Sequence, residues 1–374
     1  MRPWLGAEEA EAAAAAVASG WVAQGPRVAE FERAVADRVG SRECVAVSSC
    51  TAALHLSLVA LGLGPGDEVV VPSLSFIATA NAPTYVGATP VFADVDPVTQ
   101  DLTAKTIEQV LSPATRAVIV VHQCGMPADL AAIHELCDPA GVAVIEDAAC
   151  AIGSTYRGEP IGTGSELVAF SFHPRKVITT GEGGMLATSD AELAGRLRRL
   201  REHGMSVSAA ERHAAGRVII ERYLETGFNF RMTDVQAAIG LVQLSRLDEI
   251  VARRRRLAGR YRELLRDVPG LEMPVDPTYG ETNHQSFWVV LPDGFPVERD
   301  ELLERLLDAG ISARRGIMAA HLEPAHAERS HGDLAVTERL TRRSLLLPLF
   351  HEMTEQEQDR VAAALRREAG LRDV

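Results

Sequence analysis

The sequence predicts an α/β protein built on a mostly parallel sheet. From Glu43 onward, short apolar runs that suit strands alternate with stretches at helical spacing, and these runs are apolar throughout. Strands of that kind are buried on both faces, as happens when helices cover both sides of a parallel sheet. The seven expected strands are residues 44–49, 68–73, 90–95, 117–122, 142–147, 167–172 and 184–189.

Helices are expected before, between and after these strands. An amphipathic helix over 7–18 and a second helix from about Val28 precede the first strand. Thr233 is a suitable N-cap for a long helix that continues to about residue 265, with Asp234 in its first turn. The remaining helices of this part are expected at 51–62, 75–86, 103–112, 128–138 and 191–203.

The pattern changes after Pro269 to that of an α+β unit. We expect a strand at 285–291, a helix at 299–310 and a terminal helix at 354–368. The sequence therefore predicts two domains, a large α/β domain over 1–250 and a small C-terminal α+β domain over 251–374.

The segment 204–225 lacks clear periodicity and is rich in charged residues and histidine. Such a stretch is typical of a partly ordered loop or of a lid over a binding site.

The charge balance and the cysteines restrict the class of protein. The chain has 38 Lys and Arg against 51 Asp and Glu, and its net charge of −13 disfavours nucleic acid or an anionic membrane as the main partner. Five scattered cysteines without metal-ligand spacing favour reduced thiols and no metal site. No uncharged run approaches the length of a membrane span, and glutamates interrupt the alanine-rich start. We expect a soluble, cytoplasmic protein.

Lys176 is the most informative single residue. Only it and Lys105 are lysine among the 38 basic residues. Lys176 follows the expected strand at 167–172 and precedes a glycine-rich turn, and strand ends of this kind line active sites in α/β sheets. An amine, unlike a guanidinium, can lose its proton when desolvated and then attack a carbonyl. This stretch by itself suits a Schiff-base lysine and a surface lysine about equally.

Three further features carry possible chemistry. A strand ends at two serines and a helix begins at Thr51, a junction that suits a phosphate but also simple capping. Asp147 ends the strand at 142–147, where a nearly buried carboxylate needs a partner such as a protonated pyridine nitrogen, or caps the next turn. Asn229 and Arg231 lie just before the helix that Thr233 starts, which read alone is only a turn and a capped helix.

Together, and in this order, these four features resemble the DegT/DnrJ/EryC1/StrS family of sugar aminotransferases. Further blocks similar to that family lie at 25–32, 60–82, 87–97, 121–129 and 347–358, so the resemblance covers essentially the whole chain. These proteins are pyridoxal 5′-phosphate (PLP) enzymes of the aspartate-aminotransferase fold, PLP-dependent fold type I. The resemblance implies PLP as the cofactor and a homodimer with shared active sites.

The resemblance also implies roles for individual residues around the cofactor ring. Lys176 would form a Schiff base with the cofactor aldehyde and shuttle a proton to and from the substrate carbon. Asp147 would pair with the pyridine nitrogen, and both residues are expected to be catalytic. Phe76 would stack on the ring.

The cofactor phosphate has its own expected partners. Thr51, the backbone at Ala52 and Ser171 would bind it, and Asn229 would reach the phosphate of the neighbouring subunit. The complete set of expected cofactor-binding residues is Thr51, Ala52, Phe76, Asp147, Cys150, Ser171, Lys176 and Asn229.

Two positions depart from the usual family pattern. Cys50 stands where glycine is common, which we expect to be harmless if the backbone there avoids positive φ. Cys150 stands where the family often has a glutamine that contacts the cofactor's phenolic oxygen or the substrate. A thiol is a poor hydrogen-bond partner, so that contact need not be preserved. The presence of Lys176 disfavours the family's dehydratase branch, in which a histidine takes its place.

The residues expected to meet the substrate are His173 and Arg175, which flank the lysine, and Arg314, Arg315 and His321 in the segment 311–324. The two pairs of basic residues suit a donor carboxylate or a sugar diphosphate. A solvated turn is the alternative for the arginine pair.

The resemblance implies transfer of an amino group from L-glutamate or L-glutamine to a keto-sugar linked to a nucleoside diphosphate. A 4-keto-6-deoxy sugar is favoured because that class is common in the family. A keto-cyclitol (scyllo-inosose-type) of an aminoglycoside pathway is the alternative substrate. A non-catalytic regulatory member of the family is disfavoured by the presence of Lys176 and Asp147. A nicotinamide dehydrogenase is disfavoured because SSCTAAL stands where G-x-G-x-x-G would be needed.

Overall fold

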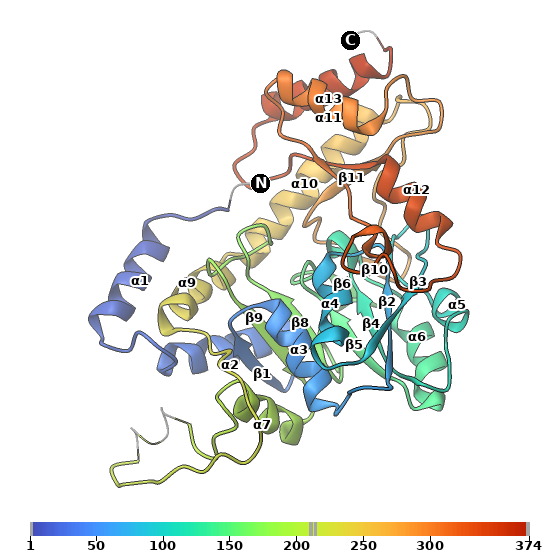
Figure 1. Cartoon of the computed structure of the whole chain (residues 1–374). Coiled ribbons are helices and arrows are strands. Elements are labelled where there is room, and N and C mark those ends of the chain that lie inside the picture. Colours follow the sequence, from blue (N-terminus) through green and yellow to red (C-terminus); the bar gives the residue numbers. More distant parts are fainter. Residues whose placement is uncertain (1–2, 209–211, 213–214, 372–374) are drawn as a thin grey trace.

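The computed structural model describes residues 3–208, 212 and 215–371, and its central element is a seven-stranded sheet (Figure 1). The strands lie in the order β1-β9-β8-β5-β4-β2-β3. Each corresponds to one of the seven predicted strands, so the predicted fold class is confirmed. Their bounds are β1 Glu43–Val47, β2 Glu68–Pro72, β3 Thr89–Ala93, β4 Thr115–Val121, β5 Ala143–Asp147, β8 Val168–Ser171 and β9 Gly184–Thr188.

The strand directions bring the candidate residues to one edge of the sheet. Strands β3, β2, β4, β5 and β8 are parallel to one another, whereas β9 is antiparallel to both β8 and β1. Asp147 and Ser171 therefore end neighbouring parallel strands. Gly184, the first residue of β9, is in register with Ser171 on one side and Val47 on the other. This carboxyl edge is where open α/β sheets bind their ligands.

Helices cover both faces of the sheet, as the apolar strands require. Residues of β1 alternate between the two layers: Val45 and Val47 belong to one core cluster, and Cys44 and Ala46 to another. Helices α3 Cys50–Ala60, α4 Ile77–Tyr85 and α7 Ala191–Leu200 contribute to the first cluster. Helices α2 Pro26–Val39, α5 Ala104–Glu108, α6 Leu130–Cys137 and α9 Asp234–Ser245 contribute to the clusters of the other face.

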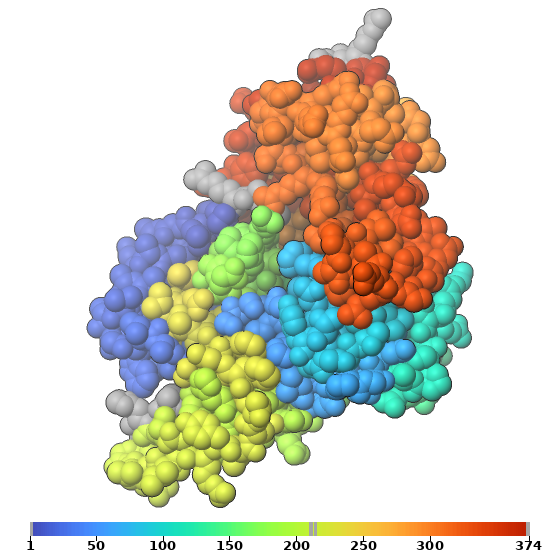
Figure 2. Space-filling view, viewed as in Figure 1, coloured from blue at the N-terminus to red at the C-terminus, as the bar shows by residue number. Residues whose placement is uncertain are grey.

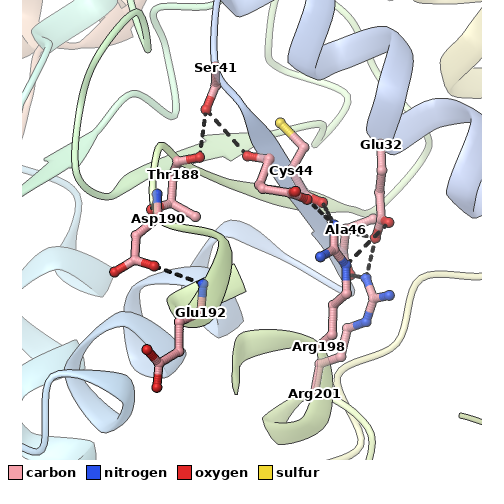
Figure 3. Close-up of polar contacts among 10 residues, drawn as sticks. Glu32, Ser41, Cys44, Ala46, Thr188, Asp190, Glu192, Arg198 and Arg201 are labelled. Carbon is pink, nitrogen blue, oxygen red and sulfur yellow. Dashed lines mark hydrogen bonds and ion pairs between the residues drawn. The ribbon is translucent and has the colours of Figure 1, made fainter. Parts of the chain in front are cut away.

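A buried ion pair fixes the edge strand β1, which leads directly into α3 (Figure 3). Glu32 of α2 accepts a hydrogen bond from Ala46 N at 2.8 Å and pairs with the Arg201 guanidinium. Arg201 Nη1 also donates to Ala46 O at 2.6 Å. Both charged side chains are buried, and a buried charge without a partner is strongly destabilising. This pairing therefore fixes β1 between α2 and the end of α7.

The prediction of one long helix after Thr233 is wrong in one detail: the structure has two helices there. Thr233 caps α9 as expected, accepting from Gln236 N at 3.2 Å, but the chain is interrupted at Arg246 before α10 Leu247–Leu265 begins. The Arg246 guanidinium pairs with Glu9 at 2.8 Å and lies 4.7 Å from the centre of the Trp4 ring. Helix α1 Ala7–Ala18 is thereby attached to the junction between α9 and α10.

The C-terminal part has its own core around a small antiparallel sheet of order β11-β13-β12. Figure 1 shows α10 running from the central sheet into this part of the chain. Ile250 and Val251 pack with the large domain, whereas Leu257 packs with the C-terminal core. These contacts support our proposal of a domain boundary near residue 250, inside α10. The elements of this part are β11 Phe287–Val290, α11 Arg299–Asp308, β12 Arg314–Arg315, α12 Ala335–Arg343, β13 Ser344–Leu347 and α13 Glu355–Glu368.

A third, very small sheet joins the two parts of the chain. Strand β10 Gly280–Glu281 pairs with β6 Thr155–Tyr156, which in turn pairs with β7 Glu159–Pro160. Three short 3-10 helices complete the described structure: η1 Gln123–Gly125, η2 Asp138–Ala140 and η3 Ala320–Leu322.

The described residues of the segment 204–225 (204–208, 212 and 215–225) extend away from the body of the molecule, at the lower left of Figure 2 in yellow-green. An isolated bridge between Met205 and Tyr223 joins its two ends. Its role as a lid stays a prediction. Over the described residues, we find no helix with the length and hydrophobicity that a membrane span requires.

Candidate active site

Lys176 lies in the turn that follows β8, and its amine has a specific partner. Lys176 Nζ donates a hydrogen bond to Cys150 Sγ at 3.1 Å. Burial of the amine lowers the pKa of Lys176, but the neighbouring Cys150 and Asp147 outweigh burial, so that the pKa is raised. The structure therefore places the rare lysine beside the thiol and near the carboxylate that the sequence had singled out separately.

Asp147 is the last residue of β5 and is buried at the carboxyl edge of the sheet. Its Oδ2 accepts from Thr79 Oγ1 and its Oδ1 accepts from Ala149 N, both at 3.1 Å. Burial raises the pKa of this carboxyl, and Lys176 offsets part of that effect. Within the described residues no Arg, Lys or His side chain forms an ion pair with Asp147. A buried carboxylate bonded only to neutral donors suits a cationic ligand atom such as a protonated ring nitrogen.

Helix α3 starts one residue earlier than predicted. Ser49 is its N-cap and accepts from Ala52 N at 3.1 Å, so Thr51 lies inside the first turn and the Ala52 N–H already has a partner. Cys50 does not have a positive φ, so the backbone at this position accommodates a side chain where the family commonly has glycine. The N–H groups of a first turn have no acceptor within their own helix, and they attract an anion.

The glycine-rich turn packs directly on the start of α3. A Cβ atom at Gly184 would lie 2.5 Å from the carbonyl carbon and oxygen of Ser49 and 2.6 Å from Cys50 N. A flexible side chain could move away from the added atom, but these neighbours are backbone atoms, so the strand or the helix itself would have to shift. Glycine at this position therefore lets β9 pass against the helix start at which a phosphate would bind.

Two further predicted cofactor residues lie at the same edge. Ser171, the last residue of β8, is buried, and its hydroxyl accepts from His173 N at 3.5 Å. Phe76 is the N-cap residue of α4 and is 63% exposed, while Thr79 in the first turn of the same helix reaches Asp147. The Phe76 ring is thus open at the edge that holds Asp147.

Asn229 lies next to the end of β1, since Ser48 N donates to Phe230 O at 2.7 Å. The Asn229 side chain is exposed and accepts from Arg231 Nε at 3.0 Å. An exposed amide is able to reach a second subunit, and its role there stays a proposal.

The predicted substrate residues fall into two groups. His173 is partly exposed, with Nδ1 accepting from Arg175 N at 3.2 Å, and burial lowers the pKa of its imidazole. Arg175, Arg314 and Arg315 are exposed, and Arg315 lies 3.4 Å from Glu323. These residues remain open to a ligand.

His321 departs from its prediction because its ring is buried. His321 Nδ1 lies 2.6 Å from Ser73 Oγ, just beyond the end of β2, and Ala320 N donates to Ser73 O at 2.7 Å. In this conformation the imidazole is closed to a substrate. The structure instead has His321 anchoring its segment to the central sheet.

Sequence reasoning missed two residues that contact the site. Thr79 follows Phe76 by three residues at the start of a helix. Residues three apart lie on the same side of a helix, so this spacing could have indicated that Thr79 also faces the sheet edge. Asn283 donates from Nδ2 to the carbonyl oxygens of Cys150 and Ile152, both at 2.8 Å. No feature of the sequence around Asn283 indicated this contact.

A mostly parallel sheet with a lysine and a buried aspartate at its carboxyl edge is the arrangement of the PLP-dependent aminotransferases of fold type I. The chain belongs to the DegT/DnrJ/EryC1/StrS aminotransferase family, whose sequence model matches residues 3–366. The predicted enzyme class is thereby confirmed.

Similar solved structures cover nearly the whole chain. The aminotransferase TlmJ from Streptoalloteichus hindustanus is 38% identical, with a TM-score of 0.91 over 99% of this chain and 98% of that one. DesV from S. venezuelae, solved with a ketimine intermediate, is 36% identical with a TM-score of 0.90 over 98% and 95%. DesI, solved in the presence of its TDP-sugar product, is 34% identical with a TM-score of 0.89 over 98% and 91%.

The residues present fit PLP, the cofactor of this family. The fit rests on three observations: the Lys176 amine, the buried Asp147 without a cationic partner among the described residues, and the glycine-lined start of α3. An amine, a carboxylate and an anion site match the aldehyde, the ring nitrogen and the phosphate of PLP.

Proposed function

We propose that this aminotransferase binds PLP covalently through Lys176 and transfers an amino group from L-glutamate or L-glutamine to a nucleotide-linked keto-sugar. The observation that carries the proposal is that a desolvated lysine and a buried aspartate lie at the same sheet edge. Membership of the family and the TDP-sugar product of DesI support a sugar substrate.

Asp147, Ser171 and the start of α3 would hold the cofactor. When bound, PLP supplies an electron-withdrawing ring that stabilises negative charge on a substrate carbon. Asp147 would keep the ring nitrogen protonated, because a buried carboxylate is best stabilised by a cation. The N–H groups of Cys50 and Thr51 and the Ser171 hydroxyl would bind the phosphate.

Lys176 would hold and return the proton that moves during the reaction. Its raised pKa keeps the amine protonated at neutral pH, so Lys176 must transfer that proton before it can attack a carbonyl. Cys150 Sγ, at 3.1 Å, is the group in direct contact with the amine.

The exposed arginines supply the basis for the substrate class. Arg175, Arg314 and Arg315 present guanidinium groups that suit a diphosphate, since arginine binds phosphate oxygens in bidentate fashion. A 4-keto-6-deoxy sugar is the particular substrate we propose. Substrate profiling tests this: amination of a keto-cyclitol but of no nucleotide sugar would contradict it.

We also propose a homodimer with shared active sites. Val218 and Ile220 are 91% and 85% exposed, and Phe76 and Asn229 are exposed as well. A second subunit that covered these apolar side chains would remove their surface from water, which favours association. The five cysteines are free thiols, which supports a cytoplasmic location.

The absorption spectrum with PLP, before and after L-glutamate, tests the proposed chemistry. We expect wild type to show a visible band from lysine-linked cofactor that bleaches with glutamate, and Lys176→Arg to lack that band. A wild type without the band, or a variant that retains it, would contradict the proposal.

A further inference from the structure

One segment of the C-terminal part contacts both loops that present the Lys176–Cys150 pair. Residues 282–286 connect β10 to β11, and all five are buried. This segment lies outside the sheet edge that carries the candidate catalytic residues. Its contacts nevertheless reach the chain on either side of the 3.1 Å contact between Lys176 Nζ and Cys150 Sγ.

Asn283 holds the loop that carries Cys150. Its Nδ2 donates to Cys150 O and Ile152 O, both at 2.8 Å, and its backbone N donates to Ser154 Oγ at 3.0 Å. A Cβ atom at Gly125 would overlap Asn283 Oδ1, so glycine there leaves room for the amide. Three hydrogen bonds thus fix residues 150–154 relative to Asn283.

Gln285 holds the turn that carries Lys176. Its Nε2 donates to Arg175 O at 2.6 Å, and Arg175 immediately precedes Lys176. Gln285 N donates to Asn283 Oδ1 at 2.7 Å. The Asn283 side chain is therefore bonded to the backbone of Gln285, and each of the two amide side chains holds one partner of the Lys176–Cys150 contact.

Two arginines of helix α10 hold the backbone of residues 282–286 in place. The buried Arg254 donates from Nη1 to the carbonyl oxygens of His284 and Gln285 at 3.2 and 3.1 Å. Arg255 Nε donates to Thr282 O at 3.0 Å. His284 has a φ of 50°, a conformation that a non-glycine residue keeps only where its surroundings impose it.

We propose that Asn283 and Gln285 are positioning residues that set the geometry of Lys176 and Cys150, and that PLP binding depends on them. The proposal rests on the proposed function, in which Lys176 binds PLP. Because both partners of a single contact are fixed from one rigid segment, loss of either amide lets one partner move relative to the other. A misplaced amine reacts less readily with its target.

Gln285→Glu tests the proposal, because it keeps the side-chain shape but replaces the donor with an oxygen that repels Arg175 O. The matched control is Gln358→Glu. Gln358 is also buried, and its Nε2 donates to Leu257 O at 2.8 Å within the C-terminal core. PLP affinity is measured by absorption titration, and the unfolding temperature of each cofactor-free variant is measured alongside.

We expect Gln285→Glu to weaken PLP binding about tenfold, the effect of one buried hydrogen bond at the upper end of its usual range. Asn283→Asp should act similarly through the Cys150 loop. Gln358→Glu should lower the unfolding temperature to a comparable extent but leave PLP affinity within about twofold, because its lost bond is remote from Lys176.

Equal PLP affinity in the Gln285 and Gln358 variants would overturn the proposal, because it would make Gln285 merely structural. If Gln285→Glu does not fold, Gln285→Leu removes the same donor without adding a charge, and the same comparison applies. A wild type that binds no PLP would overturn the proposed function as well, which distinguishes the two failures.

Discussion

Cys150 Sγ accepts a hydrogen bond from Lys176 Nζ at 3.1 Å. The pair joins the loop after β5 to the turn after β8, across the boundary of two neighbouring parallel strands. Cys150 stands where the family often has glutamine, so in this chain a thiol is the group that meets the amine. The effect of this thiol on the pKa of the Lys176 amine can therefore be tested by removing the thiol.

Removing the thiol should change the pH dependence of PLP association. Burial lowers the pKa of Lys176, but Cys150 and Asp147 raise it by more. Cys150→Ala removes one raising group, so the amine should lose its proton at lower pH. We expect the profile of PLP association rate against pH, followed by absorbance, to move to lower pH.

Cys137→Ala is the control for that experiment, because Cys137 is a buried thiol at the end of α6. Its profile should match that of wild type. An unchanged or upward-shifted profile for Cys150→Ala would show that the thiol does not support the protonated amine.

Asp147→Asn should separate stability from catalysis. Burial raises the pKa of Asp147, with Lys176 partly opposing it, so stability falls as the pH rises from the ordinary pKa of an aspartate to this raised pKa, and the full penalty is present at higher pH. The neutral amide lacks this penalty. We expect the cofactor-free variant at pH 8 to be at least as stable as wild type in thermal unfolding, while its transamination rate falls at least about 100-fold. Retained activity, or a large loss of stability, would be inconsistent with the assigned role.

Gly184→Ala should disturb the start of α3. The added methyl group would press on Ser49 and Cys50 backbone atoms at about 2.5 Å, so the strand or the helix must shift. We expect a loss of about 1–3 kcal/mol in urea unfolding and a PLP affinity at least about tenfold weaker. Gly294→Ala is the control, because nothing lies within 4 Å of a Cβ there and its φ is ordinary. A similar outcome for both variants would remove Gly184 from the phosphate site.

Mixed dimers test whether Asn229 acts in the neighbouring subunit. Lys176→Ala and Asn229→Ala are each expected to be inactive, or nearly so, as homodimers. If the sites are shared, a mixed dimer contains one site with both native residues, and mixing should restore activity toward half per heterodimer. If Asn229 serves its own subunit, no site in the mixed dimer has both residues. Activity that stays at the level of the separate variants would then contradict shared sites.

The order of strands and helices was predictable because apolar runs and helical spacing report burial directly. The positions of Lys176 and Asp147 at the carboxyl edge of the sheet were also predictable, since Asp147 ends a buried strand and Lys176 follows one. The break at Arg246 was not predictable, because the sequence there continues the helical pattern and the interruption accompanies distant contacts with Glu9 and Trp4.

Contacts between distant segments account for the other differences. His321 was expected near the substrate, but its burial depends on Ser73, which is 248 positions away. Asn283 and Gln285 likewise act on loops more than 100 positions away. Side-chain amides of this kind carry no local pattern, so only the folded chain shows what they hold.

Locating the cofactor on the chain tests the central claim most directly. PLP bound to wild type is reduced with borohydride, and the modified residue is found by mass spectrometry of the peptides. Lys105 is the only other lysine in the sequence and serves as an internal control. We predict modification of Lys176 alone, and none in Lys176→Arg. Modification of Lys105 with Lys176 left unmodified would contradict the account.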